Sequence, residues 1–177
     1  MGQDLVPSIQ KIPLKTKIRL IPARTTHARL LWNWRTDAAA HTASINQTPF
    51  SYSQHLQWVK KALASKDMLI YIVRNEHNKS IGYIRFQRRN KIEAHLSIAL
   101  ATKYRFQGYG WRGLKLSAEK LFHHWQVKKI IALIKMKNDS SYKAFFKAGF
   151  TKEANIAING ERFIKFEKCR TSVISSP

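Results

Sequence analysis

The stretch Tyr104-Arg105-Phe106-Gln107-Gly108-Tyr109-Gly110-Trp111-Arg112-Gly113 decides the fold of this chain. It follows an apolar run typical of a strand, Leu96 to Leu100, and it precedes a segment typical of a helix, Leu114 to Trp125. Two glycines spaced two apart at the start of a helix let the backbone approach a ligand closely, because neither carries a Cβ atom. The free N–H groups of a first helical turn face a common point and favour an anion. The stretch therefore predicts a phosphate-binding turn.

Three kinds of phosphate-binding turn share parts of this pattern. The motif Gly108-x-Gly110-x-x-Gly113 matches the dinucleotide fingerprint, which also needs an acidic residue about twenty positions later. The region Lys128 to Leu133 contains no acid. A Walker A loop ends in Gly-Lys-Ser/Thr, whereas this chain reads Gly110-Trp111-Arg112. The third pattern, Arg-x-x-Gly-x-Gly, is met by Arg105-x-x-Gly108-x-Gly110, and it stands beside the simpler interpretation of a plain helix-start turn.

The third pattern resembles the pyrophosphate loop of the GCN5-related N-acetyltransferases, which bind acetyl-coenzyme A (acetyl-CoA). The downstream sequence is similar to that family as well. An apolar run of strand length, Lys129 to Lys135, precedes a polar break, Lys137 to Ser141, and a short helix, Tyr142 to Lys147, that is closed by Ala148-Gly149-Phe150. Two motifs in the right order are more specific than either alone, and the resemblance covers roughly residues 17 to 168.

Periodicity and turn residues predict the other elements. Strands are expected at Ile18–Pro22, Met68–Arg74, Ser80–Arg88, Lys91–Leu100, Lys129–Lys135, Thr151–Ile158 and Arg162–Lys168, with helices at Ala28–Thr36, Ser51–Ala64, Leu114–Trp125 and Tyr142–Lys147 and a polar connection at Ala38–Pro49. The pair Asn159-Gly160 is a strong hairpin signal, and Ser51-x-x-Gln54 is a capping box. The family resemblance implies an α/β (α+β) fold, with a mixed, mainly antiparallel sheet of about seven strands and about four helices that splays open at the acetyl-CoA site.

Length and composition fit one globular domain. The chain has 177 residues, of which 44% are hydrophobic, so it can bury a sizeable core and is not disordered. We expect an acetyltransferase domain at residues 17–170 between tails at 1–16 and 171–177. No apolar run is long enough to span a bilayer, and residues 1–16 lack the apolar core of a signal peptide. A single cysteine cannot form an internal disulfide, so a cytoplasmic protein without membrane association is expected. A homodimer is left open.

The net charge is unusual, because 32 Lys and Arg residues face 10 Asp and Glu residues, for a formal charge of +22. Such a field attracts anions, so nucleic acid is the first partner to consider. The basic residues are scattered along the chain, however, and no RNA-recognition signature, zinc finger or basic leucine zipper occurs. Coenzyme A and nucleotide-linked sugars are also polyanions. A general basic bias, steering of an anionic substrate and nucleic-acid binding are the three interpretations, and nucleic acid is not the favoured one.

Two N-terminal segments limit the range of possible acetyl acceptors. The runs Trp32-Asn33-Trp34-Arg35-Thr36-Asp37 and Ser51-x-x-x-His55-x-x-Trp58 are similar to segments of one branch of the family. That branch includes acetyltransferases of UDP-linked 4-amino sugars, as in pseudaminic acid biosynthesis, and acetyltransferases of ribosomal-protein N-termini, polyamines or antibiotics. The resemblance implies a small-molecule amine, possibly UDP-linked, with Arg35, His55 and Trp58 in the wall of the acceptor pocket. Leu31 and Trp34 have the spacing of a buried helix stripe instead.

The resemblance also implies a set of coenzyme contacts. Backbone groups of Ile98, Ala99 and Leu100 would hold the pantetheine arm and the acetyl carbonyl. Backbone N–H groups of the loop would hold the pyrophosphate, with added charge from the Arg105 side chain. The loop residues are Arg105, Phe106, Gln107, Gly108, Tyr109, Gly110 and Trp111, and Asn138, Ser141 and Phe145 complete the expected coenzyme-binding set. With one cysteine and no paired carboxylates, no metal site is expected.

Acetyl transfer needs a neutral amine, so we looked for a base. Glu93, His95, Ser97 and Ala99 share one face of the coenzyme-facing strand by the two-residue period. Glu93 is the only carboxylate there, and His95 lies nearer the expected thioester and has an intrinsic pKa close to neutral. Either side chain could accept the amine proton, directly or through water. The alternative is that both merely line a wet pocket.

The departing thiolate can use an acid, which in the family is often a tyrosine seven residues after the helix-opening asparagine. In this chain that position is Phe145, which cannot donate a proton. Tyr142 lies three residues earlier, on the same helix face, and is the candidate acid. A thiolate can also leave unassisted, since a thiol pKa near 8.5 makes it a tolerable leaving group. The remaining interpretation of Tyr142 is a packed aromatic side chain.

Overall fold

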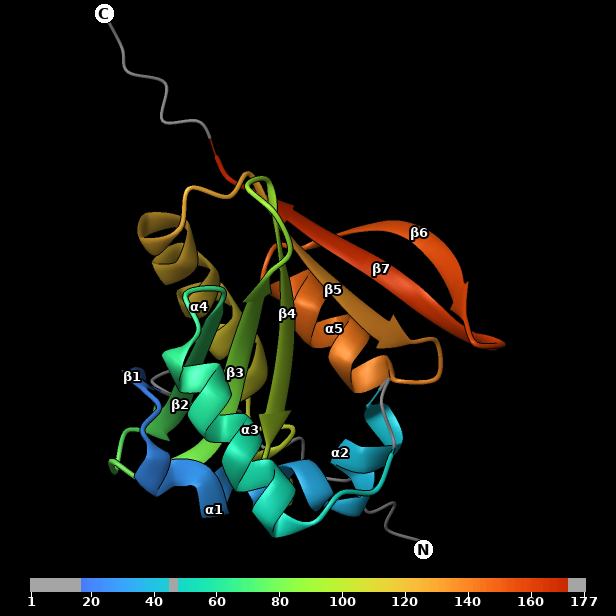
Figure 1. Ribbon diagram of the computed structural model, residues 1–177. Helices are drawn as coiled ribbons and strands as arrows, with labels where there is room; N and C mark the ends of the chain where they lie inside the picture. Colours follow the sequence, from blue (N-terminus) through green and yellow to red (C-terminus); the bar gives the residue numbers. More distant parts are fainter. Residues whose placement is uncertain (1–16, 45–47, 172–177) are drawn as a thin grey trace, which may run out of the picture.

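A seven-stranded sheet forms the centre of the structure, a computed structural model that describes residues 17–44 and 48–171. The strand order is β1-β2-β3-β4-β5-β7-β6, and every neighbouring pair is antiparallel except β4 and β5 (Figure 1). The strands are β1 (Ile18–Pro22), β2 (Met68–Asn75), β3 (Ser80–Arg88), β4 (Glu93–Leu100), β5 (Lys129–Lys135), β6 (Thr151–Ile158) and β7 (Glu161–Cys169). The predicted mixed, mainly antiparallel sheet is confirmed.

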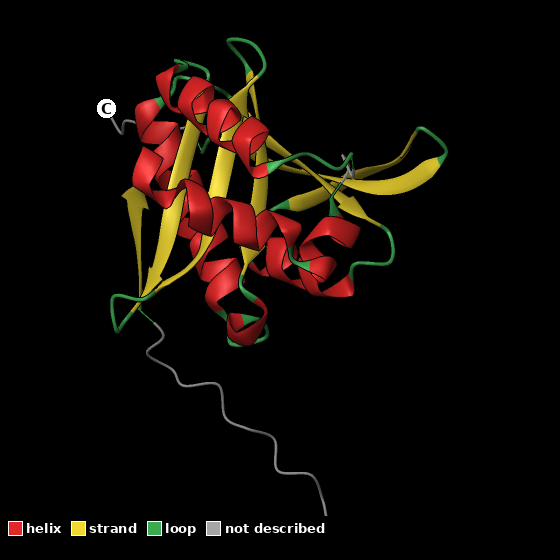
Figure 2. Cartoon of the chain, turned by 60° about the horizontal axis from the view of Figure 1, so that its bottom comes forward, coloured by secondary structure: helices red, strands yellow, loops and turns green. Residues whose placement is uncertain are grey.

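Helices pack against this sheet, and the β6–β7 hairpin projects beyond them (Figures 1 and 2). The α-helices are α1 (Ala28–Thr36), α2 (Ala38–Ala43), α3 (Tyr52–Ala64), α4 (Tyr109–His124) and α5 (Asp139–Lys147), with short 3-10 turns η1 (Thr25–His27) and η2 (Thr102–Tyr104). None of the helices in the described parts of the chain is both long and apolar enough to cross a membrane. The expected tails lie, except for Thr171, outside the described residues.

Two hydrophobic clusters hold the helices in place. In the first, Leu114 and Leu121 of α4 and Phe145 of α5 pack with Ala94 and Leu96 of β4. In the second, apolar side chains of α1 and α3 pack on β2: Leu31, Trp34, Val59, Ile70 and Ile72. Successive strand residues point to opposite faces of a sheet, so the sheet has α4 and α5 on one side and α1 and α3 on the other. The predicted core positions of Leu31 and Trp34 are confirmed.

Local sequence signals account for several element ends. The Ser51 hydroxyl accepts a hydrogen bond from the Gln54 N–H at 3.2 Å, and the Gln54 side chain accepts from the Ser51 N–H at 2.7 Å, so the predicted capping box starts α3. Asn159 and Gly160 both adopt positive φ, at 50° and 77°. Two successive positive φ angles are typical of a type I′ hairpin turn, which confirms the predicted β6–β7 hairpin.

The sequence-based boundaries were wrong at several helix starts. Part of the expected polar connection is helix α2, which begins where the Asp37 carboxylate accepts the Ala40 N–H at 3.2 Å. The described residues thus contain five α-helices, where about four were expected. Helix α4 begins inside the glycine loop at Tyr109, and α5 begins at Asp139, because Asn138 caps it. Capping bonds of this kind depend on side-chain placement that hydrophobic periodicity does not report.

Candidate functional site

The parallel strands β4 and β5 pair over only three residue pairs, and this short pairing opens the site. The pairs are Glu93 with Lys129, Ala94 with Ile130 and His95 with Ile131. Beyond them β4 stays paired with β3 to its end, and β5 stays paired with β7 to its end. The edge of β4 from Leu96 to Leu100 therefore faces away from β3 without a strand partner among the described residues. Backbone N–H and C=O groups on such an edge are available to a ligand.

The N-terminus of α4 lies beside this open edge. A Cβ atom added at Gly110 would lie 3.8 Å from Leu100 of β4 and 3.8 Å from Ala144 of α5. The residue that precedes the helix, Gly108, supplies no side-chain cap, and the first turn contains no acidic residue. The N–H groups of this turn thus lack the partners that Ser51 and Asn138 provide for α3 and α5. An uncapped helix N-terminus with no acid nearby fits an anionic group.

The loop before α4 is held in an unusual backbone conformation. Phe106 has φ 61° although it is not glycine, and its side chain is 83% exposed. Gly108 has φ 82°, and a Cβ atom there would meet the Arg112 guanidinium at 2.4 Å. Residues in the left-handed region are strained unless they are glycine, and such strain is kept mainly where function requires the loop shape.

Several side chains of the loop are engaged in contacts within the protein. The loop therefore presents mainly backbone N–H groups and nearby cations to a ligand. Tyr109 is buried, and its hydroxyl donates to the Glu76 carboxylate at 3.1 Å. The Gln107 amide donates to the Lys103 carbonyl at 2.7 Å. The Trp111 ring lies 4.4 Å from the Arg112 guanidinium and 4.8 Å from the Lys147 ammonium. These cations add positive charge around the helix start.

Arg105 has a different role from the expected one. Its guanidinium donates to the Leu100 carbonyl at 3.0 Å and to the Asp37 carboxylate at 2.8 Å. Asp37 also accepts the Thr102 hydroxyl at 2.8 Å, and this hydrogen bond, together with that of Arg105, lowers the pKa of the Asp37 carboxyl. The Arg105 side chain therefore ties the loop to the α1–α2 junction. Its charge is paired with Asp37, whereas we had expected it to face the pyrophosphate at the loop N–H groups.

The remaining expected coenzyme residues are Asn138, which caps helix α5, and Ser141 and Phe145 within it. The Asn138 side-chain oxygen accepts the Ser141 N–H at 3.1 Å and the Ser140 hydroxyl at 3.0 Å. The amide NH2 of Asn138 makes no hydrogen bond to the described residues, so it can donate to a carbonyl. Ser141 contributes its backbone N–H to the cap and, in the described residues, no side-chain hydrogen bond.

The two aromatic residues Tyr142 and Phe145 of α5 differ in their burial. Phe145 is 3% exposed, and its ring centroid lies 5.1 Å from that of Phe150, so its side chain is packed in the core instead of facing the expected coenzyme path. Tyr142 is partly buried against Phe166 at 5.2 Å. Its hydroxyl makes no hydrogen bond to the described residues and remains available as a donor.

Glu93 and His95 lie together at the end of the β4–β5 pairing. The His95 Nε2 atom is 2.7 Å from Glu93 Oε1, and both side chains are partly buried. Lys129 Nζ lies 3.8 Å from the other Glu93 oxygen and 3.3 Å from Glu167 Oε2. The two alternative bases thus form a hydrogen-bonded pair. Across the described residues, no group of three or more His, Cys, Asp or Glu side chains is placed to hold a metal ion.

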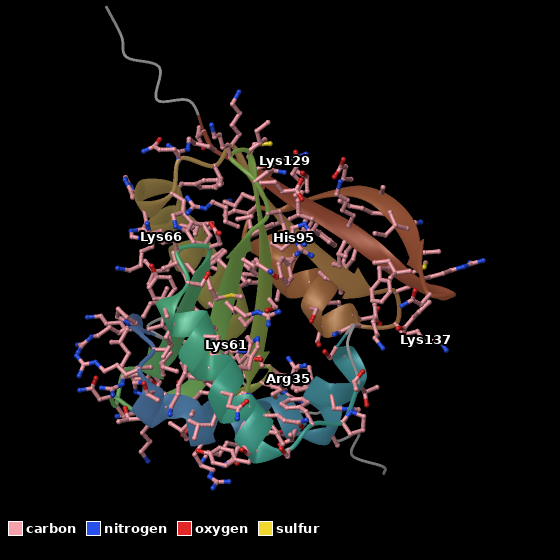
Figure 3. The ribbon with its side chains drawn as sticks, viewed as in Figure 1. Arg35, Lys61, Lys66, His95, Lys129 and Lys137 are labelled. Carbon is pink, nitrogen blue, oxygen red and sulfur yellow. The ribbon has the colours of Figure 1, made fainter. Side chains whose placement is uncertain are left out.

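The face of the sheet that carries His95 also carries arginines. In the β3–β4 register, Gln87 is opposite His95 and Arg85 is opposite Ser97, so these residues share one face. The Arg85 guanidinium lies 5.7 Å from the Trp58 ring of α3, and the Arg35 guanidinium of α1 lies 4.6 Å from the Phe50 ring. In Figure 3, Arg35 lies at the foot of β4 and His95 higher on the same strand. Arg35 and Trp58, the residues expected in the acceptor wall, thus lie in the helices that cover this face of the sheet.

His55 does not face this wall. It is 2% exposed, and its ring contacts those of Trp32, Phe50 and Trp58 at 5.5, 5.8 and 5.7 Å. Its Nε2 atom has no hydrogen-bond partner. Burial lowers the pKa of His55, a backbone hydrogen bond with Ala28 opposes this, and the Arg35 charge lowers it further. The sequence-based assignment of His55 to the acceptor pocket was thus wrong for its side chain, which packs α3 against α1.

The comparison with known families agrees with this geometry. A family model described as an acetyltransferase (GNAT) domain matches residues 17–151. The chain belongs to the GNAT acetyltransferase family. It is an N-acetyltransferase with acetyl-CoA as its co-substrate. No curated protein matches the sequence of this acetyltransferase.

Solved structures share the fold at low sequence identity. Spermidine N-acetyltransferase from Vibrio cholerae, in complex with CoA and spermine, is similar with a TM-score of 0.78 and 15% identity over 86% of this chain and 95% of that one. The enzyme AAC(6')-Ib, in complex with paromomycin and acetyl-CoA, has a TM-score of 0.74 and 15% identity over 86% of this chain and 93% of that one. Such identities establish the GNAT fold and leave the acceptor to this chain's own residues.

Sequence reasoning missed two residues that shape the site. Arg85 lies in a strand where polar residues alternate with Ile84 and Phe86, and this period-two pattern was the available signal that Arg85 leaves the core. Asp37 was quoted only as part of a motif, and its partners Thr102 and Arg105 are more than sixty residues away. No local pattern predicts such a contact.

We expect Gly110→Glu to weaken acetyl-CoA binding at least tenfold, or about 1.4 kcal/mol. A carboxylate in the first turn of α4 would compete for its N–H groups and repel phosphate, while a negative charge at a helix N-terminus does not destabilise the helix. The matched control is Gly110→Ala, because a Cβ atom at this position has only ordinary contacts. Calorimetric titration with acetyl-CoA and thermal unfolding measure the two effects. Equal affinities of the Glu and Ala variants would show that the phosphate lies elsewhere.

His55 should make the folded protein sensitive to mild acid. Its pKa is lowered from 6.5 in the folded state, so below about pH 6.5 the unfolded chain binds a proton that the folded protein does not. The free energy of unfolding should then fall by up to about 1.4 kcal/mol per pH unit until the folded pKa is reached. We expect His55→Phe, which keeps an aromatic ring against Trp58, to lose less stability than the wild type between about pH 7 and about pH 5. Chemical denaturation at each pH measures the free energy of unfolding, and an equal loss in the two proteins would contradict this prediction.

Proposed function

We propose that this acetyltransferase transfers the acetyl group of acetyl-CoA to the primary amine of a nucleotide-linked amino sugar. The observation that carries the proposal is the position of the Glu93–His95 pair, where β4 leaves β5, on the sheet face that also carries Arg85. The pair supplies a proton acceptor beside the open coenzyme edge, and the arginine gives the acceptor side a positive charge.

The coenzyme would bind along the open edge of β4. Backbone groups of Ile98 to Leu100 would hold the pantetheine arm, the first-turn N–H groups of α4 would hold the pyrophosphate, and the Asn138 amide would donate to a pantetheine carbonyl. Bound in this way, acetyl-CoA supplies an acetyl group as a thioester. The uncapped start of α4 and the unpaired edge of β4 support this placement.

His95 would act as the base and Glu93 as its positioning partner. With the Nε2 proton donated to the Glu93 carboxylate, the Nδ1 atom keeps a lone pair that can accept the proton of the amine. Lys129, which bridges Glu93 and Glu167, holds that carboxylate in place. Tyr142, with its available hydroxyl, would donate a proton to the thiolate.

The charge on the acceptor side of this chain argues against a polycationic acceptor. The two similar solved structures hold spermine and paromomycin, which are polycationic amines. Here Arg35 and Arg85 line the acceptor side, the Glu93 carboxylate is engaged with His95, and the Asp37 carboxylate is engaged with Arg105. A polycation would be repelled, whereas an amine that carries a negative group would be attracted.

Two other functions remain outcomes of the test. The branch that the N-terminal segments resemble also acts on protein N-termini and small amines, so a peptide or polyamine could be the acceptor. The charge of +22 also suits a nucleic-acid-binding protein without catalysis, but the Glu93–His95 pair would have no role in such a protein.

We expect His95→Gln to lower kcat by about 10²- to 10⁴-fold, the usual contribution of a general base. The acetyl-CoA affinity should stay within about twofold, because His95 is not assigned to coenzyme binding. Glu93→Gln should have a smaller effect on kcat, since the amide can still accept the Nε2 proton. Thiol-release kinetics together with acetyl-CoA titration measure both quantities. A larger loss in Glu93→Gln than in His95→Gln would reverse the two roles.

Acceptor identity is tested by thiol release from acetyl-CoA over a panel of UDP-linked 4-amino sugars, N-terminal peptides and polyamines. Turnover should be fastest with the UDP-linked amine and negligible with spermidine. Faster turnover with a polyamine or a peptide would replace the proposed acceptor. A salt-sensitive RNA complex without acetyl-CoA binding would replace the enzymatic function itself.

A further inference from the structure

Arg85 is a partly buried cation in an electrostatically unfavourable environment. Its guanidinium on β3 is partly buried, and no carboxylate among the described residues forms an ion pair with it, although Asp37, Asp67, Glu93 and Glu167 all pair with other cations. Burial lowers the pKa of Arg85, Tyr83 opposes this, and the charges of Arg35 and Arg89 lower it further. The fold thus gathers positive charge at a site with no internal counterion.

Such an arrangement costs stability unless something outside the protein compensates it. Removing a cation from water without a partner is unfavourable, and nearby like charges add to the penalty. Charged side chains in perturbed environments cluster at functional sites, and a bound ligand of opposite charge would remove the penalty here. Because the missing charge is negative, the ligand should be an anion.

The surroundings of the two arginines fit a phosphate that is attached to a sugar and a base. Arg85 lies over the Trp58 ring and Arg35 over the Phe50 ring. An aromatic ring under the face of a guanidinium leaves its N–H edge free for two parallel hydrogen bonds to phosphate oxygens. The same rings give a base or sugar an aromatic surface to contact.

The position of Arg85 relative to His95, the proposed general base, sets the distance between the anion and the amine of the ligand. Arg85 is opposite Ser97 in the sheet, and His95 is two residues from Ser97 on the same face. The backbone positions of diagonal neighbours of this kind lie roughly 7–8 Å apart. Arg85 and His95 are therefore close enough for one nucleotide-linked amino sugar to reach both.

We propose that Arg85 and Arg35 form an anion subsite that binds the phosphate groups of a nucleoside-diphosphate-linked acceptor. The proposal rests on the proposed function, since the amine of this acceptor is the one that His95 deprotonates. It assigns acceptor binding to Arg85, which binds neither the coenzyme nor the acetyl group.

The test is calorimetric titration of the full chain, saturated with CoA, with UDP as the probe. Saturation with CoA blocks the coenzyme loop, so UDP can report only a second site. We expect UDP to bind and to inhibit competitively against the amine but not against acetyl-CoA, and inorganic pyrophosphate to bind more weakly because it lacks a base and a ribose. Arg85→Gln and Arg35→Gln should each raise the Kd for UDP at least tenfold.

Arg29→Gln is the matched control. It removes the same charge from α1, where Arg29 is exposed and lies 3.6 Å from the Tyr52 ring centroid, so it should leave the Kd for UDP within about twofold. Arg85→Met adds a readout that a structural role would not give. Loss of an unpaired, partly buried cation should leave the Tm unchanged or raise it, while a residue that holds the fold together would lower it.

Three results would overturn the subsite: no binding of UDP to the CoA-saturated protein, displacement of UDP by CoA, or an unchanged Kd in Arg85→Gln. A folded Arg85→Met variant with a clearly lower Tm would argue for a structural role instead. Failure of the proposed function would give a different result from failure of the subsite. In that case UDP would still bind through Arg85, but no UDP-linked amine would release thiol from acetyl-CoA.

Discussion

The short parallel contact between β4 and β5 is the constraint on which the site depends. Three residue pairs join the strands, and each strand then follows its other neighbour, β4 with β3 and β5 with β7. The separation leaves one backbone edge of β4 open, and the start of α4 lies near its end, where Gly110 is close to Leu100 of β4 and Ala144 of α5. Full pairing to the strand ends would satisfy that edge internally and leave its backbone groups unavailable to a ligand.

A second constraint joins the two halves of the site. Asp37, at the junction of α1 and α2, accepts hydrogen bonds from Thr102 and Arg105, which lie between β4 and α4. The α1–α2 junction and the glycine loop therefore share one partly buried ion pair. Because Arg105 also donates to the Leu100 carbonyl, a movement of α1 would reach the end of the open β4 edge through a single side chain. Partly buried pairs of this kind are costly to break, since they leave a charge without its partner.

Much of the fold was predictable from sequence, because the signals were local. The strands show hydrophobic runs of the right length, Ser51 and Gln54 form a capping box, and Asn159-Gly160 forms the hairpin turn. Helix α2 and the start of α4 were missed, since their ends depend on Asp37 and on the backbone of Gly108. At the site, the glycine loop and the shared face of Glu93 and His95 were predictable, while the burial of His55 and the ties of Arg105 were not.

By itself, the sequence determined the family, the positions of the strands and the glycine loop before α4, because glycine spacing, strand periodicity and turn residues act over a few neighbouring positions. The tertiary structure alone decided which charges meet. It paired Glu93 with His95, committed Arg105 to Asp37 and left Arg85, near the Arg35 charge, without an ion-paired carboxylate in the described part of the chain. Electrostatic energies depend on distance and burial in space, and residues as far apart as Asp37 and Arg105 acquire a distance only when the chain has folded.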